Sequence, residues 1–272
     1  MKKQIKLLIV ALLFGLLQAC GGNDSASGSM AKMDASSPDG ALMAVVQSLK
    51  SNDIKALMQS SMSSADYDKV VQEFEKAKMS PSESDKAKYL QMMGMLTSDG
   101  AVENLMAMAA PQLEQARSQL PMLLMMGKGM APQAIQSNPD FSTDQKESLT
   151  KAANAFFAFA SENDFLSEEV TRKAITIAVD TAKNLNMSSL DELQNMSFDQ
   201  ATDKASLVMG GFKNIVGVYG ISVDDLLGSI DVSDVVENGD SASMKLAYKF
   251  LGESIVQDVK MVKKDGKWTA SK

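Results

Sequence analysis

Histidine is absent from the 272-residue chain, and cysteine occurs once, at Cys20. Without histidine, the protein lacks the usual general base of enzymes and the commonest ligand of transition metals. Zinc sites built from cysteine and histidine, and nucleophiles activated by histidine, are therefore excluded by composition. A single cysteine cannot form an internal disulfide, so the folded domain must depend on its hydrophobic core.

Positive charge is also scarce. The chain carries 27 basic and 34 acidic residues, a net charge of −7, and its only arginines are Arg117 and Arg172. Three of the lysines lie within the first six residues, and without them the net charge is −10. An acidic protein is repelled by nucleic-acid phosphates and by anionic lipid head groups. We therefore expect no nucleic-acid partner.

The N-terminus combines the parts of an export signal. Three lysines precede an apolar run over residues 7–17, which ends in Leu-Gln-Ala-Cys at residues 17–20. A transmembrane helix needs roughly 20 apolar residues, so this run is too short, but it has the length of a signal-peptide core. We predict a signal peptide over residues 1–19. A transmembrane anchor with an incidental cysteine is the alternative.

Residues 17–20 resemble the lipobox of bacterial lipoproteins, in which a branched residue, a tolerant position and a small residue precede the cysteine. The resemblance implies that Cys20 becomes the first mature residue and carries two or three acyl chains, enough for stable membrane anchoring. Gly21 replaces the aspartate that favours inner-membrane retention in enterobacterial lipoproteins, so the resemblance implies an outer-membrane location facing the periplasm. The polar, aperiodic composition that follows predicts a flexible tether, so residues 20–36 comprise the lipidated cysteine and this tether.

Apolar residues at helical spacing predict a largely helical region from residue 37 to residue 228. The first helix begins at Ser37-Pro38-Asp39, because serine can cap it, proline suits its first turn and aspartate faces its positive end. Pro132 and Pro139 predict a loop over residues 131–140. Further helices are expected at residues 54–58, 67–78, 83–96, 101–126, from Thr143 or Asp144 through Phe159, and at residues 167–185, 189–195 and 199–219.

After Gly228 the periodicity changes to two, which predicts strands at residues 230–235, 243–251 and 254–262 and a last one at Trp268. Asn-Gly-Asp at residues 238–240, Gly252 and Asp265-Gly266 are the turn signals between them. The sequence therefore predicts an α+β fold, predominantly helical with a C-terminal antiparallel β-meander of about four strands. One globular domain would cover residues 37–272; a helical part over residues 37–228 and a separate sheet over residues 229–272 are the alternative.

Two segments resemble exported lipoproteins with an NTF2-like domain, a cone-shaped α+β fold. The first is the opening helix pair, with Ser-Pro at its start and Asn-Asp-x-x-Ala-Leu at its centre, over about residues 37–62. The second is the closing meander, over residues 229–272, with Asp-Gly-x-Trp near its end. The resemblance implies a sheet curled around helices, often with an apolar pocket at its mouth.

Methionine is abundant, with 21 in the chain, and many of them cluster between residues 92 and 130. Thioethers can bind Cu(I), but no histidine or second cysteine accompanies them, which disfavours copper. Most of them stand where leucine would on an apolar helix face, so we predict mainly core. An adaptable groove for an apolar ligand or partner protein is the alternative, lined by Met92, Met95, Met122, Met125, Met126, Phe156 and Phe159.

Two weaker patterns would suit a hydrolase. Adjacent carboxylates occur at residues 168–169, 191–192 and 224–225, but neighbours on a helix point apart, and acids are favoured in first turns. Ser148 and Lys151 match the Ser-x-x-Lys pattern of serine acyl-enzymes, without the Lys-Thr-Gly strand that should follow.

The preferred interpretation is a non-catalytic lipoprotein without metal or cofactor. Its acyl chains would anchor it, and it would bind an envelope protein or an apolar ligand. An envelope hydrolase that uses carboxylates or a Ser/Lys pair, and a purely structural envelope component, remain the alternatives. Close helix packing would explain Gly210-Gly211 and the Gly217-x-x-Gly220 pattern, and Trp268 should cover the core between sheet and helices.

Overall fold

The computed structural model describes residues 36–77, 81–139 and 141–271. The predicted signal peptide, Cys20 and all of the tether before residue 36 lie outside these residues. Within the described ranges, no helix is both long enough and apolar enough to cross a membrane.

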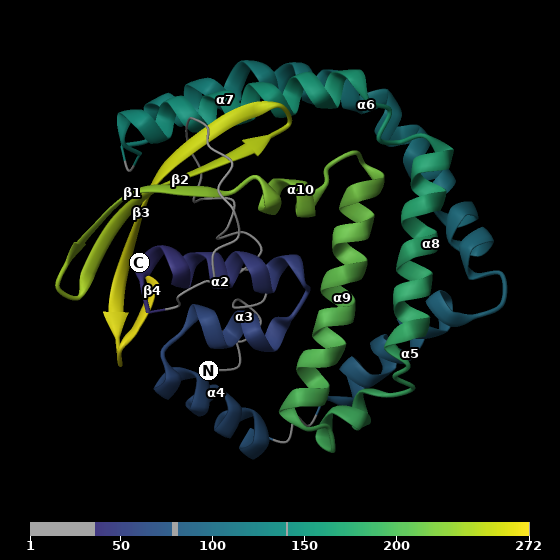
Figure 1. The fold of residues 1–272 in the computed structure, drawn as a ribbon. Coiled ribbons are helices and arrows are strands. Elements are labelled where there is room, and N and C mark those ends of the chain that lie inside the picture. The colour runs from purple at the N-terminus through teal and green to yellow at the C-terminus, as the bar shows by residue number, and fades with distance from the viewer. Residues whose placement is uncertain (1–35, 78–80, 140, 272) are drawn as a thin grey trace.

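Helices fill the chain up to residue 228 and a four-stranded antiparallel sheet follows, which confirms the predicted fold class. Figure 1 shows the sheet on one side of the molecule and the long helices α8 and α9 side by side on the other. The helices are α2 (Pro38–Lys50), α3 (Ile54–Ser61), α4 (Ser64–Ala77), α5 (Glu83–Thr97), α6 (Ala101–Ser137), α7 (Thr143–Glu162), α8 (Glu168–Leu185), the 3-10 helix η2 (Leu190–Gln194), α9 (Phe198–Val218) and α10 (Val223–Gly228).

Serine begins most of these helices. Its hydroxyl accepts a hydrogen bond from a backbone N–H of the first turn, which satisfies one of the unpaired donors there. Ser142 caps α7, with Gln145 completing a capping box, so the predicted caps Thr143 and Asp144 were one or two residues late. The capping serines are Ser37, Ser82, Ser142, Ser167, Ser189, Ser197 and Ser222.

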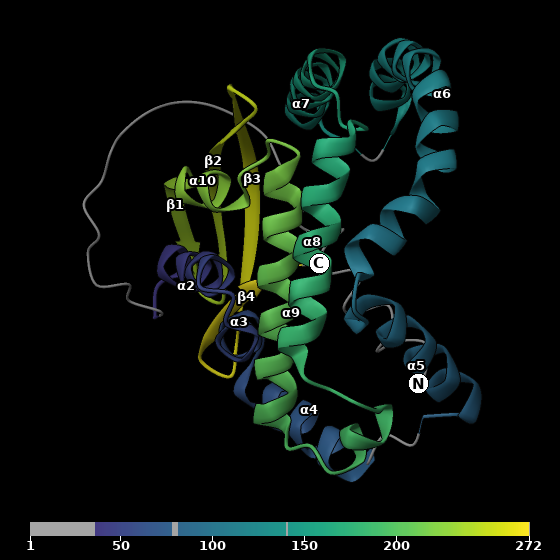
Figure 2. The ribbon, with the colours of Figure 1, turned by 90° about the vertical axis from the view of Figure 1, so that its right-hand side faces the viewer.

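Helix α6 runs from Ala101 to Ser137 with Pro111, Pro121 and Pro132 inside it. The predicted end at residue 126 and the predicted loop over residues 131–140 are therefore wrong for residues up to 137. A proline inside a helix removes one hydrogen bond and bends the helix rather than always ending it. Figure 2 shows this bending, and the curved helix contacts α5 near its start, α8, and α7 along its end. Packing along these contacts outweighs the local preference of proline.

The sheet has the order β1-β2-β3-β4, with β1 (Asp231–Asn238), β2 (Ser241–Phe250), β3 (Glu253–Lys264) and β4 (Lys267–Ala270). The three predicted turn regions join these strands. Strand β2 buries every second side chain, from Ala242 to Tyr248, against the helices. Strand β1 is an exposed edge, and a register shift after Ser233 places Asp234 at a φ of 52°. Such a bulge twists an edge strand and discourages pairing with other chains.

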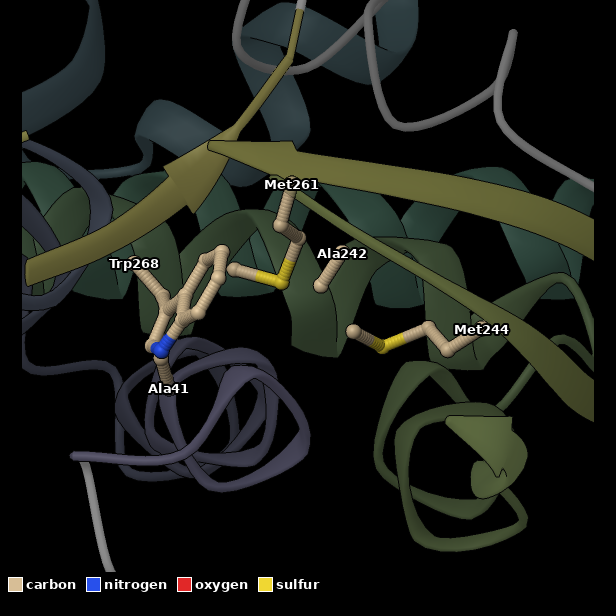
Figure 3. Close-up of a cluster of buried hydrophobic side chains, with 5 residues drawn as sticks. All are labelled: Ala41, Ala242, Met244, Met261 and Trp268. Carbon is tan, nitrogen blue, oxygen red and sulfur yellow. The ribbon is translucent and has the colours of Figure 1, made fainter. Parts of the chain in front are cut away.

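Trp268 is the centre of the sheet–helix core (Figure 3). Its side chain is 1% exposed and lies in one cluster with Ala41 of α2, Met244 of β2 and Met261 of β3. Its indole N–H donates to the carbonyl oxygen of Ser36 at 3.1 Å. The prediction that Trp268 covers this core is confirmed. The two segments that carry the NTF2-like resemblance therefore pack against each other.

Helix α9 packs against several of the other helices. Gly211 permits its close contact with α8, because a Cβ there would lie 2.3 Å from Oγ1 of Thr181. Lys204 donates to the carbonyl oxygen of Leu185 at the end of α8. Lys213 donates to two carbonyl oxygens at the end of α2, so both lysines meet the negative ends of neighbouring helices.

Candidate functional site

The clustered methionines are mostly exposed, so the prediction that they form core is wrong for most of them. Only Met93 and Met106 of the cluster are buried, at 8% and 7% exposure. Spacing alone did not reveal this, because thioether side chains on a helix face look the same in sequence whether another element covers them or not. The exposed members are Met92, Met95, Met108, Met122, Met125, Met126 and Met130.

Five exposed side chains on α6 form one apolar surface, the methionine ridge: Met122, Leu123, Met125, Met126 and Met130. Their exposed fractions range from 51% to 76%. Between Arg117 and Asp140 the chain has a single charged residue, Lys128. Large exposed apolar patches on a protein surface commonly mark interaction sites.

The seven residues predicted to line one groove do not all come together, although Met122, Met125 and Met126 share the methionine ridge. Met92 and Met95 lie on α5, which Figures 1 and 2 place at the far end of α6 from α7. Phe156 on α7 is 41% exposed. Phe159 is half-buried and contacts the ring of Phe165 at a centroid distance of 5.4 Å, so it joins a structural aromatic cluster.

The Ser-x-x-Lys pattern does not form a reactive pair. Ser148 is buried and donates its hydroxyl proton to the carbonyl oxygen of Val256 on β3 at 3.3 Å. Lys151 forms an ion pair with Glu147 at 2.8 Å. A nucleophilic serine would direct its hydroxyl proton at a base. Ser148 instead uses it to link α7 to the sheet.

The adjacent carboxylates lie in the first turns of α8, η2 and α10, as predicted. Hydrogen bonds from Lys173, Lys86 and Ser188 lower the pKa values of Glu169, Asp191 and Glu192, respectively. A general acid needs a raised pKa. The lowered pKa values instead favour the charged form of these three carboxylates, which suits a structural role. In the part of the chain that the structure describes, no three acidic or cysteine side chains gather into a metal-binding group.

A groove that the sequence did not reveal runs along α9. It consists of three hollows with volumes of about 500, 600 and 470 Å³, in order along the helix. The first two share Asp203 and Leu207, and the second and third share Asn214. We call this row of three adjoining hollows the α9 groove. Its floor on α9 is Gln200, Asp203, Leu207, Gly210, Asn214 and Gly217, at intervals of three or four residues.

The walls of the α9 groove combine polar side chains with apolar ones, such as Ile177, Met196 and Val223, and come from four elements. Helix α8 contributes Thr181 and Asn184, and the turn between α2 and α3 contributes Ser51 and Asn52. Residues from α10 and from the end of η2 line the two ends. The lining contains no phenylalanine, tyrosine or tryptophan.

Asn52 is the unusual residue of this lining. Its φ is 58°, in the left-handed region that asparagine tolerates better than most residues. Its Oδ1 is buried without a hydrogen-bond partner. Its Nδ2 lies over Gly210, where a Cβ would approach it to 3.2 Å. A buried acceptor without a donor costs free energy.

The glycines of α9 have two different roles. Gly211 allows close packing, as predicted, whereas nothing lies within 4 Å of a Cβ at Gly217. Close packing therefore does not explain Gly217, which leaves space in the groove. The repeat of small and polar residues along one face of α9 was the signal in the sequence that could have revealed the groove. No protein-family model matches the chain, and no match was found among curated proteins or solved structures.

Proposed function

We propose that the protein is a lipid-anchored, non-catalytic binding protein that holds a partner protein in the cell envelope. The methionine ridge on α6 carries this proposal. Its side chains are exposed and uncharged, and flexible thioethers adapt to differently shaped apolar surfaces. The partner would present an apolar helix or strand face of its own.

A partner protein suits the ridge better than an apolar small molecule or a bilayer. A small ligand needs a concave site, and none of the three hollows along α9 is lined by a ridge residue. Helices that lie on membranes are rich in lysine and arginine, whereas residues 118–139 contain one basic residue, Lys128. The acidic chain as a whole also favours a protein over an anionic lipid surface.

The anchor belongs to the same proposal. Acyl chains on Cys20 would keep the domain at the outer membrane, and residues 21–36 would let it reach its partner. The structural partners of Ser148 and of the paired carboxylates support a role without catalysis.

Site-specific photocrosslinking tests the proposal. A photoreactive side chain replaces Met125, which is 76% exposed, in the full-length protein expressed in its own envelope. We expect one defined protein adduct, joined to an apolar face of the partner, which Met122→Ser/Met126→Ser reduces at least fivefold. The same photoreactive group at Glu114, an exposed charged position on α6, is the matched control and should give no adduct. Cys20→Ser should move the protein out of the membrane fraction and reduce the adduct.

Three outcomes would contradict the proposal. An adduct with lipid would assign the ridge to the bilayer. An adduct of twice the protein's own mass would assign it to self-association. No adduct at Met125, or one unaffected by the ridge substitutions, would remove the ridge as a docking surface. The substituted side chains are exposed, so we expect the variants to change stability by less than about 0.5 kcal/mol.

A further inference from the structure

We infer that the α9 groove is a second binding site, which takes an extended, polar segment of polypeptide. The inference does not depend on the methionine ridge, because the two surfaces share no residue. It rests on the length of the groove, on its carboxamide lining, on the unpaired oxygen of Asn52, and on the charge of its exposed groups.

The length of the groove suits a chain rather than a small molecule. Its floor extends from Gln200 to Val218, which corresponds to about 27 Å at the rise of an α-helix. An extended polypeptide rises roughly 3.3 Å per residue, so the groove accommodates about eight residues. Neighbouring hollows share lining residues, so the three adjoin one another along the helix.

The chemistry of the lining matches a peptide backbone. Carboxamides both donate and accept hydrogen bonds, as the backbone amide does, and Asn52, Asn184, Asn195 and Asn214 are distributed along the groove. Oδ1 of Asn52 lacks a donor in the free protein, and a turn of its carboxamide toward the groove would let it accept from a backbone N–H of a bound segment. The absence of aromatic side chains from the lining disfavours a glycan, because sugar rings are usually held against aromatic faces.

The charges favour a neutral or basic segment. Lys204 and Lys213 belong to the lining, but their ammonium groups already donate to carbonyl oxygens of neighbouring helices. Asp203 is exposed at the junction of two hollows, and Glu192 lies at one end. Basic residues in the bound segment would meet these carboxylates.

Selection with a library of randomised octapeptides displayed on phage tests the inference. The library is selected on the wild-type protein and counter-selected on Gly217→Trp, which places a large side chain in the groove at a position where an added Cβ meets no atom within 4 Å. Gly94→Trp is the matched control, because it makes the same change in α5, also in open space. Affinities of selected synthetic peptides are then measured by fluorescence anisotropy.

We expect polar, net basic peptides that bind the wild-type protein and Gly94→Trp equally and bind Gly217→Trp at least tenfold more weakly. Asn52→Gly keeps the backbone conformation but removes the carboxamide, and it should weaken binding about threefold or more. The ridge variant Met122→Ser/Met126→Ser should bind the peptides normally, which separates this test from that of the proposed function.

Equal enrichment on wild-type protein and Gly217→Trp would overturn the inference, as would the absence of any enriched peptide. Binding of a chitin tetrasaccharide that Gly217→Trp abolishes, without peptide binding, would assign the groove to glycans instead. Hydrogen exchange of both tryptophan variants would show whether their folds are intact, and an unfolded Gly217→Trp would be replaced by Gly217→Leu.

Discussion

Lys213→Met is the sharpest test of how the helices are held together. The Lys213 side chain is 7% exposed. Its ammonium group donates to the carbonyl oxygens of Leu49 at 3.1 Å and Lys50 at 3.0 Å. It also forms an ion pair with Asp224. Methionine keeps the length of the apolar stem but removes the charge, so the substitution isolates the polar contacts.

The magnitude follows from these contacts. A hydrogen bond to a charged group contributes about 1.5–3 kcal/mol, and two carbonyl oxygens at the end of α2 would lose theirs. The carboxylate of Asp224 is 59% exposed, so the ion pair adds only about 0–1 kcal/mol. Relief of the desolvation of a buried ammonium group offsets part of the loss. We expect a net decrease of about 2–4 kcal/mol in the free energy of unfolding.

Urea unfolding followed by circular dichroism measures this decrease. Lys173→Met is the matched control, since Lys173 is 61% exposed and pairs with Glu169 on the same helix. It should change stability by less than about 0.5 kcal/mol. Asp224→Asn should cost no more than about 1 kcal/mol. A Lys213→Met protein as stable as wild type would refute the argument. It would mean that the hydrogen bonds from Lys213 to the end of α2 only offset the free-energy cost of burying its charge.

Gly211→Ala should lower the free energy of unfolding by about 1–3 kcal/mol, because its Cβ would lie 2.3 Å from Oγ1 of Thr181 and separate α8 from α9. Gly94→Ala, which meets no atom within 4 Å in α5, should raise it by about 0.5–1 kcal/mol, and equal effects in urea unfolding would contradict the packing argument. The pKa of Glu192 is lowered by hydrogen bonds from Ser188, so its contribution to stability is present above its ordinary pKa of 4.5 and is lost as the pH falls through the lowered value. Glu192→Gln should therefore reduce the decline of the melting temperature on the acid side, and an unchanged pH profile would argue against that contribution.

Local chemistry made the fold class predictable. Ser37, Pro38 and Asp39 begin α2 in the predicted way, and Asp265-Gly266 turns β3 into β4. These signals involve neighbours in sequence, so they act the same way in any fold. Trp268 was also predictable as core, because a large aromatic side chain on a short strand needs a face to cover.

The candidate sites were much less predictable. Whether Met125 is core or surface depends on whether another element covers its side of α6, and nothing in the local pattern states this. The α9 groove combines α9 with residues far away in the chain, such as Asn52 and Thr181. The functional patterns that are local in sequence, including Ser148 with Lys151, proved to have structural partners instead.

Most helices, strands and turns follow from local sequence, because caps, turn residues and periodicity act over a few residues. The tertiary structure alone decided that α6 continues through Pro111, Pro121 and Pro132, since contacts with its neighbours outweigh the local cost of each proline. It also decided which apolar face stays uncovered and which helices enclose the α9 groove. Burial depends on the whole arrangement of elements, and that arrangement is the sum of many small packing energies that no short stretch of sequence contains.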